Sequence, residues 1–296
     1  MSVELIDNAL ITQFSDAIHV AAQQIKARMR PYVQIKPMSG EVFAYDGLGP
    51  IEASEVIGRQ QLVQFADINH LRRKIVRRRF SITLPIDAVD VRGMLTNPQG
   101  DYAQACVRAM ERVFDRIVVG CLFATVYTGR DFATPVSFAT DGGSTVTATG
   151  GLTYAKMLAI NQNFIDAEVG NDIPEKIVMG IAGNEYTKLM QEVEFISKDF
   201  TAEAYVDKGR LQRLVGIDVV QFAGGVANPI LAVASSVRSC FAMSTRGVCV
   251  GMSKEMGLSI EKRPDLIETV QVQSVFDLGA VRTEGVLVQK VTTTAS

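Results

Sequence analysis

The sequence predicts an α+β fold organised around one long helix, and three observations support this class. Residues 97–127 have the apolar spacing of a helix. Residues 37–92 alternate short strand-like runs with loop signals, whereas residues 153–290 begin with helices and continue as strands. A chain of 296 residues has room for one large domain or two smaller ones.

The long helix begins well, because Asn97 is a good N-cap and Pro98 stands in the first turn, where a missing N–H costs nothing. Charged residues such as Asp115 and Arg116 lie off the apolar face, and beyond residue 116 the segment is apolar on every side. A helix of this length is roughly 45 Å long, which suits a spine more than a compact core. Its apolar stripe is Tyr102, Cys106, Ala109, Val113 and Ile117.

The strongest concentration of charge is the run 71–79, LRRKIVRRR, which we expect within one strand over Arg73–Leu84. Side chains of a strand alternate between two faces, so this strand carries charge on both faces and is unsuited to a core. We therefore expect a projecting hairpin whose charges meet water or another chain. The candidate contacts between subunits, with nucleic acid or solvated surface as alternatives, are Arg72, Arg73, Lys74, Arg77, Arg78 and Arg79.

The other segments predict a simple order of elements. Residues 4–29 form an amphipathic helix that Arg30-Pro31 ends, and it packs on its own core or on a neighbouring subunit. Residues 128–151, rich in Gly, Ser and Thr, predict a flexible or hairpin-like insertion. We then expect three helices, over 153–168, from an Asn184 cap to about Phe195, and over 197–204. Strands are expected over 41–45, 61–65, 176–181, 211–222, 230–234, 239–250 and 257–261. Further strands are expected within 266–290, on either side of Asp277-Leu278-Gly279.

The sequence gives little support for catalysis or metal binding. His19 and His70 lie in different segments without a cysteine or carboxylate at ligand spacing, and the four cysteines form no CxxC pair. Asp87 and Asp90 resemble an acid–base pair, but nothing places a nucleophile or a metal beside them. We therefore expect no catalytic residue, no metal site and no cofactor.

Composition narrows the possible partners. A net charge of −2 and a pI near 5.8 disfavour a dedicated nucleic-acid binder and leave open only a weak, non-specific face toward DNA. The longest apolar run, about eleven residues, is too short to span a membrane, and the acidic N-terminus does not resemble a signal peptide. An apolar content of 47% suffices for a sizeable core and for large protein interfaces. We expect a soluble, intracellularly made protein.

The order of the parts is the most informative signal. An amphipathic arm, a charged hairpin, a long helix, a Gly/Ser/Thr-rich insertion, an α/β segment and terminal strands follow one another. This order resembles the major capsid protein of tailed double-stranded DNA bacteriophages, a fold shared with encapsulins. The best local likenesses are residues 13–24 and 270–282, and they are similar to the group with a short arm and no long N-terminal scaffolding domain.

The resemblance implies a division of the chain. Residues 1–36 would be the N-terminal arm and residues 37–92 the extended loop. Residues 93–150 with 262–296 would form the peripheral domain around the spine helix, and residues 151–261 the α/β axial domain. In the family, the arm and the extended loop lie over neighbouring subunits.

The resemblance also implies a structural protein and not an enzyme. Its copies would assemble as pentamers and hexamers into an icosahedral shell around double-stranded DNA. Scaffolding, portal and decoration proteins would be its partners, with non-specific contact to the packaged DNA and none to a membrane. It would be made in the host cytoplasm and end in the virion capsid.

Two alternatives to this interpretation remain. An encapsulin-like compartment would share the fold but enclose enzyme cargo, and a soluble α/β enzyme is disfavoured because no catalytic constellation is visible.

Some family members cross-link subunits through a Lys–Asn isopeptide bond. Lys74 is the one lysine of the extended loop, and no partner asparagine or catalytic glutamate can be identified, so we expect no cross-link.

Overall fold

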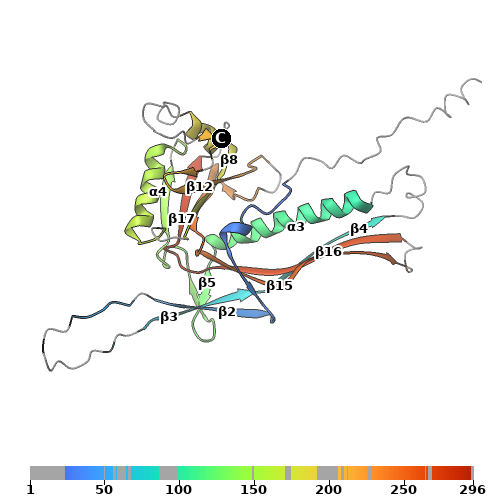
Figure 1. The fold of residues 1–296 in the computed structure, drawn as a ribbon, viewed down its shortest axis with the longest axis horizontal. Helices are drawn as coiled ribbons and strands as arrows, with labels where there is room; N and C mark the ends of the chain where they lie inside the picture. The colour runs from blue at the N-terminus through green and yellow to red at the C-terminus, as the bar shows by residue number, and fades with distance from the viewer. Residues whose placement is uncertain are drawn as a thin grey trace, which may run out of the picture. The chain divides into compact units, whose positions relative to one another are not determined.

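The α+β class is confirmed by a computed structural model, which contains helices and several sheets (Figure 1). Two compact units are present, one built from parts of 79–113 and 254–277 and the other from parts of 27–78, 114–253 and 278–296. The residues that the structure describes are 24–49, 51–55, 58, 65, 68–86, 99–148, 150–170, 175–191, 206–207, 210–211, 213–225, 229–263, 265 and 269–294.

The larger unit contains a seven-stranded sheet in the order β11-β12-β8-β14-β17-β7, with β13 paired to β14. β8 runs parallel to β12, and β14 runs antiparallel to both β8 and β17. All six residues of β8, IVMGIA, are buried, as expected for an apolar run in a central strand. The strands are β7 (Ser144–Ala148), β8 (Ile177–Ala182), β11 (Arg213–Leu214), β12 (Ile217–Phe222), β13 (Val233–Ala234), β14 (Val237–Ser244) and β17 (Val288–Thr294).

Two strands of this sheet come from segments that the sequence analysis assigned to the other domain. β7 lies within 93–150 and β17 within 262–296, yet β17 pairs with both β14 and β7. The seven-stranded sheet therefore combines strands from the segments 93–150, 151–261 and 262–296. Pairing of β17 across distant sequence is a long-range contact that no local pattern encodes.

The predicted helix over 153–168 is confirmed as α4 (Tyr154–Asp166), which buries Met157, Ile160 and Phe164. α5 (Gly183–Met190) is also present, but its N-cap is Ala182 without a side-chain cap bond, so the prediction of an Asn184 cap is wrong. The predicted end near Phe195 and the short helix over 197–204 lie outside the described residues.

The spine helix is confirmed as α3 (Gln99–Leu122), although it ends five residues earlier than predicted. Gly120 and Tyr127 are exposed, so the expectation that its apolar end is buried on every side is wrong. The buried apolar row has a spacing of four residues, as in i±4 ridge packing, and consists of Cys106, Met110, Phe114, Val118 and Leu122. Asn97 and Pro98 lie outside the described residues.

Asp115 was placed off the apolar stripe of α3, yet it is fully buried. Its carboxylate accepts the backbone N–H groups of Arg28 and Met29 at 2.9 and 3.0 Å. Those residues precede η1 (Arg30–Tyr32), a single 3-10 turn where the predicted first helix should end. The rest of that predicted helix, residues 4–23, lies outside the described part of the chain.

No helix within the described residues is long and apolar enough to cross a membrane.

The basic run does not form one strand. β3 (His70–Val76) ends before Arg77 and β4 (Arg78–Ile86) begins after it, in a different sheet, while the Arg77 N–H donates to the Glu41 carbonyl at 2.9 Å. β3 forms a four-stranded sheet in the order β2-β3-β5-β6, with β2 (Val42–Leu48), β5 (Val126–Thr128) and β6 (Thr134–Val136). At the start of the predicted insertion 128–151, β5 and β6 form an antiparallel hairpin, whereas β7 in the same range pairs with β17. The predicted strand 61–65 lies almost entirely outside the described residues.

The third sheet has the order β1-β15-β16-β4. Its strands besides β4 are β1 (Gln34–Pro37), β15 (Val248–Arg263) and β16 (Thr269–Arg282), and the short pair β9 (Val206–Asp207) and β10 (Arg210–Leu211) stands apart. The predicted interruption at Asp277-Leu278-Gly279 is wrong, because β16 continues through it. Gly279 instead permits close packing, since a Cβ there would lie 2.2 Å from the Val76 carbonyl oxygen.

Candidate assembly site: the basic strand and its buried anchor

The six basic residues of the candidate site occupy four kinds of environment. Arg72 is exposed and pairs with Asp46 of the neighbouring strand β2 at 3.1 Å, with its guanidinium 5.7 Å from the centre of the Phe132 ring. Both partners of this pair are open to solvent, so the interaction contributes little to stability.

Arg73 contradicts the expectation that the charges of this strand meet water or another chain. Its side chain is 2% exposed, and its two terminal nitrogens donate to the Asp141 carboxylate at 2.8 and 2.6 Å. A third bond runs to the Arg282 carbonyl at 3.2 Å. A buried guanidinium needs such a paired carboxylate, and here it comes from a residue 68 positions away in the sequence.

The Asp141 carboxylate also forms an ion pair with a second arginine. Arg282, which is fully buried, donates its Nε to the same carboxylate at 2.8 Å. Its Nη1 donates to the carbonyls of Leu122 and Ala124 at 2.6 and 3.1 Å. Leu122 is the last residue of α3, so the guanidinium satisfies a carbonyl at the negative end of the helix dipole.

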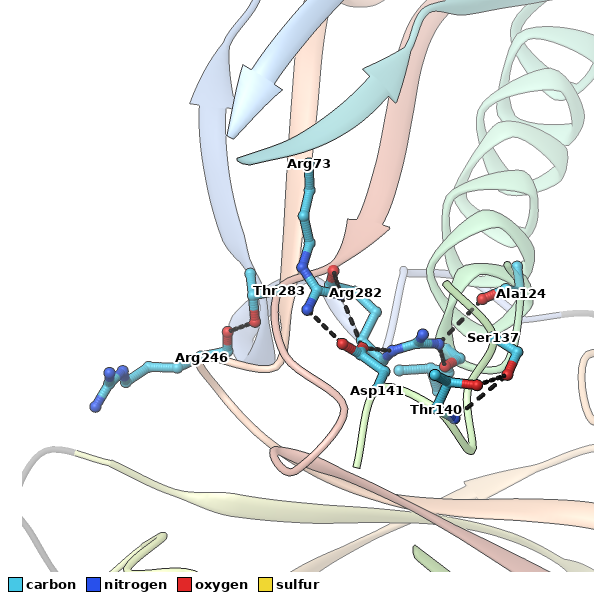
Figure 2. A network of polar contacts seen from close by, with 9 residues as sticks. Arg73, Ala124, Ser137, Thr140, Asp141, Arg246, Arg282 and Thr283 are labelled. Carbon is cyan, nitrogen blue, oxygen red and sulfur yellow. Dashed lines mark hydrogen bonds and ion pairs between the residues drawn. The ribbon is translucent and has the colours of Figure 1, made fainter. Parts of the chain in front are cut away.

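We call Arg73, Asp141 and Arg282 the anchor cluster; Figure 2 shows both guanidinium groups directed at the one carboxylate. The Arg282 guanidinium also lies 5.2 Å from the centre of the Phe138 ring. Sequence reasoning missed Asp141 and Arg282 as partners. The available signals were weak: an Asp-Gly-Gly turn, and an arginine at the end of an alternating strand.

Arg79 has an exposed side chain that holds a buried partner. It is 67% exposed and bonds Asp277, which is 3% exposed, with Nε at 3.0 Å and Nη2 at 3.0 Å. The hydrogen bonds and the charge of Asp277 raise the pKa of Arg79 above its ordinary value. Because this guanidinium neutralises a buried carboxylate of the same chain, Arg79 is poorly suited to act only as a contact with a neighbour.

Lys74, Arg77 and Arg78 form the fourth group. Lys74 and Arg77 are half-buried and Arg78 is exposed, and none of the three has an ion-pair partner among the described residues. Their role as contacts with a neighbouring subunit therefore stays a prediction.

The β2–β3 hairpin also presents apolar side chains to solvent. Leu48 is 60% exposed at the end of β2, and Ile51 is 55% exposed in the connection that follows it. Phe65 is 95% exposed and Ile68 45% exposed on the return to β3. Isolated exposed apolar residues are ordinary, but four at the end of one hairpin and in its connection fit a surface that contacts protein.

The described residues show no group of His, Cys, Asp and Glu side chains suited to hold a metal ion. His70 is exposed in β3, and Asp87 and Asp90 lie outside the described residues. Burial raises the pKa of Cys121 and of Cys240 to about 12 and that of Cys249 to about 11. Thiols with such pKa values are poor nucleophiles and poor metal ligands at neutral pH.

Comparison with known families decides the identity of the chain. The family model described as phage capsid protein matches residues 6–294. The chain belongs to this family. The predicted resemblance is thereby confirmed, and the chain is a structural protein of the phage capsid.

Solved capsids share the fold of this capsid protein. It matches the capsid of cyanophage P-SCSP1u with 14% identity and a TM-score of 0.72, covering 98% of this chain and 95% of that one. The capsid of Helicobacter pylori bacteriophage KHP30 matches with 12% identity and a TM-score of 0.72 over 100% and 98%. That of Ralstonia phage GP4 matches with 10% identity and a TM-score of 0.71 over 100% and 98%. The sequence matches no curated protein.

Proposed function

We propose that the capsid protein is the major shell subunit and that its copies form pentamers and hexamers that close into an icosahedral shell around double-stranded DNA. The observation that carries this proposal is the family match over residues 6–294. Likeness of fold to capsid structures, over 98–100% of this chain and 95–98% of those chains, supports it.

The β2–β3 hairpin, within the proposed extended loop 37–92, supplies one assembly surface. Its exposed apolar residues contribute affinity. Arg77 and Arg78, which follow β3 in the chain, carry charges that set the register with a neighbour. Repetition of such modest contacts around closed symmetry yields a stable shell without any single strong contact. The proposed arm (1–36), peripheral domain (93–150 with 262–296) and axial domain (151–261) supply the others.

Electron microscopy and light scattering of the purified chain, expressed alone and with its genomic neighbours, test the assembly. Capsomer rings or closed particles are expected. Dependence on a neighbouring gene indicates a scaffolding partner, and DNA inside the particles distinguishes a virion shell from a compartment with enzyme cargo. A monomer or dimer under every condition contradicts the proposal.

Charge reversal tests the role of Arg77 and Arg78 in assembly. The double variant Arg77→Glu with Arg78→Glu should block or misdirect assembly while the subunit stays folded, because neither side chain has an ion-pair partner among the described residues. Arg79 is left unchanged because it neutralises Asp277. Arg130→Glu, an exposed arginine between β5 and β6, is the matched control and should assemble normally. Normal particles from the double variant would remove these residues from the assembly surface.

Portal and decoration proteins are proposed further partners, together with the packaged DNA, and the host cytoplasm is the proposed site of synthesis. We propose no isopeptide cross-link through Lys74, which is half-buried opposite Ala44 in the hairpin. Mature particles should therefore run as one monomer band on a denaturing gel. A ladder of covalent multimers would overturn this.

A further inference from the structure

The β2–β3 hairpin is attached to the rest of its sheet at one position. β2 and β3 pair along their whole length, from Val42 with Val76 to Leu48 with His70. β3 pairs with β5 only where Arg73 faces Thr128. A single bridge leaves the direction of a hairpin poorly fixed by backbone hydrogen bonds, so side chains at the bridge must fix it.

Arg73 is also the outermost buried residue of the hairpin. Closer to its base, Ile75 is fully buried in a cluster with Met38, Val126, Cys249 and Val281. Beyond Arg73, the described residues of the hairpin and of its connecting loop are exposed or half-buried. The ion pair with Asp141 thus lies where the packed base changes into the projecting part.

The backbone around Asp141 holds its carboxylate in place. The Asp141 N–H donates to the Ser137 carbonyl at 3.1 Å, and the Gly143 N–H donates to the Phe138 carbonyl at 3.0 Å. A Cβ at Gly285 would lie 2.2 Å from the Asp141 carbonyl oxygen, so the neighbouring turn is packed directly against it. The carboxylate is therefore a fixed point and the arginines orient to it.

The two arginines depend on Asp141 to different degrees. Arg282 has two further acceptors at the end of α3, the carbonyls of Leu122 and Ala124. Arg73 has one other acceptor, the Arg282 carbonyl at 3.2 Å. Without the carboxylate, two buried positive charges would face one another, and the side with fewer remaining bonds would move.

From this asymmetry we infer that Asp141 is a positioning residue that fixes the direction of the β2–β3 hairpin through Arg73. Loss of its charge releases β3 at the single bridge to β5, while Arg282 stays on the end of α3. The consequence for shell formation rests on the proposed function; the positioning of the hairpin within one subunit does not.

Distance measurement between two spin labels tests this directly. The labels are attached to Ser54→Cys in the hairpin loop and Ala155→Cys on α4, both exposed positions. Burial raises the pKa of the native cysteines, so labelling at neutral pH favours the introduced thiols. The full-length chain is diluted with unlabelled chain so that label pairs within one subunit dominate.

Three variants are compared with the parent chain. Asp141→Asn should broaden or shift the distance distribution, and Arg73→Lys should act in the same direction because it keeps the charge but loses the bidentate geometry. Asp131→Asn, an exposed change of the same kind ten residues away, should leave it unaltered. Circular dichroism establishes that each variant is folded, and Arg73→Lys decides the question if Asp141→Asn does not fold.

Identical distributions in the parent and in the folded variants overturn the positioning role. In a separate experiment, electron microscopy measures whether the parent chain and the variants assemble. Misdirected or absent particles for Asp141→Asn, with normal particles for Asp131→Asn, extend the role to the shell. If the parent itself forms no particles, the proposed function fails, whereas a broadened distribution in Asp141→Asn still supports the positioning of the hairpin.

Discussion

Two buried ionic clusters of the larger unit differ in composition. In the seven-stranded sheet, Glu185 of α5 accepts Arg238 Nη1 at 3.1 and 3.0 Å and the Thr293 hydroxyl at 2.7 Å. One carboxylate balances one guanidinium there. In the anchor cluster, one carboxylate serves two guanidinium groups.

The clusters also differ in what they connect. Glu185, Arg238 and Thr293 come from α5, β14 and β17, which are elements of one sheet and a helix beside it. The anchor cluster joins a hairpin, a turn, a strand end and a helix end. Burial of charge alone therefore does not reveal its role: the balanced cluster completes a core, whereas the unbalanced one holds separate segments in register.

The largest effect is expected from the balanced cluster. Glu185→Gln leaves Arg238 buried without a counter-charge and should lower the free energy of unfolding by roughly 3–5 kcal/mol. Urea denaturation measures this loss, with the exposed Glu261→Gln as control. A loss no larger than that of the control would mean that Arg238 reaches solvent on its own.

Within the anchor cluster, the two arginines should differ. Arg282→Lys loses bonds to Asp141 and to the helix end and should cost roughly 1.5–3 kcal/mol of unfolding free energy, more than Arg73→Lys. Parallel urea denaturation of the two variants gives the comparison. Equal losses would contradict the asymmetry on which the positioning role of Asp141 depends.

Substitution of one turn glycine in each of the two regions is expected to have a smaller effect on stability. Gly142, next to Asp141, and Gly216, in the turn between β11 and β12, have φ angles of +83° and +78°. Alanine in this conformation costs about 1–2 kcal/mol at either site. Gly142→Ala should cost more, because its Cβ would lie 3.0 Å from Val286, whereas Gly216 faces open space. Thermal unfolding of both variants measures the difference. A larger loss of stability for Gly216→Ala than for Gly142→Ala would show that Val286 moves aside at little cost in free energy.

The smallest effect is expected from an exposed pair of the smaller unit, which contrasts with both buried clusters. Arg263 donates to Asp265 with Nε at 2.9 Å, and this bond lowers the pKa of Asp265. The folded pKa lies below the unfolded one, so any stabilisation is present above the ordinary carboxyl pKa and is lost as the pH falls through the folded value. Arg263→Gln should raise the pKa of Asp265 in an NMR titration; an unchanged pKa would contradict the pairing.

The sequence alone determined the elements whose signal is local. α3, α4 and β8 were predictable because apolar spacing over a few turns, or a short apolar run, reports which face is buried. The family likeness was predictable for a related reason, since it rests on the order of such elements along the chain.

Only the tertiary structure decided which charges are buried. Arg73 was predicted to be exposed because its own strand is basic, yet Asp141 lies 68 positions away and Arg282 lies 141 positions from Asp141. Asp115 looked like part of the polar face of α3 until Arg28 and Met29 supplied their N–H groups. A charged side chain is buried only when a distant segment brings its partner, and local periodicity contains no information about that partner.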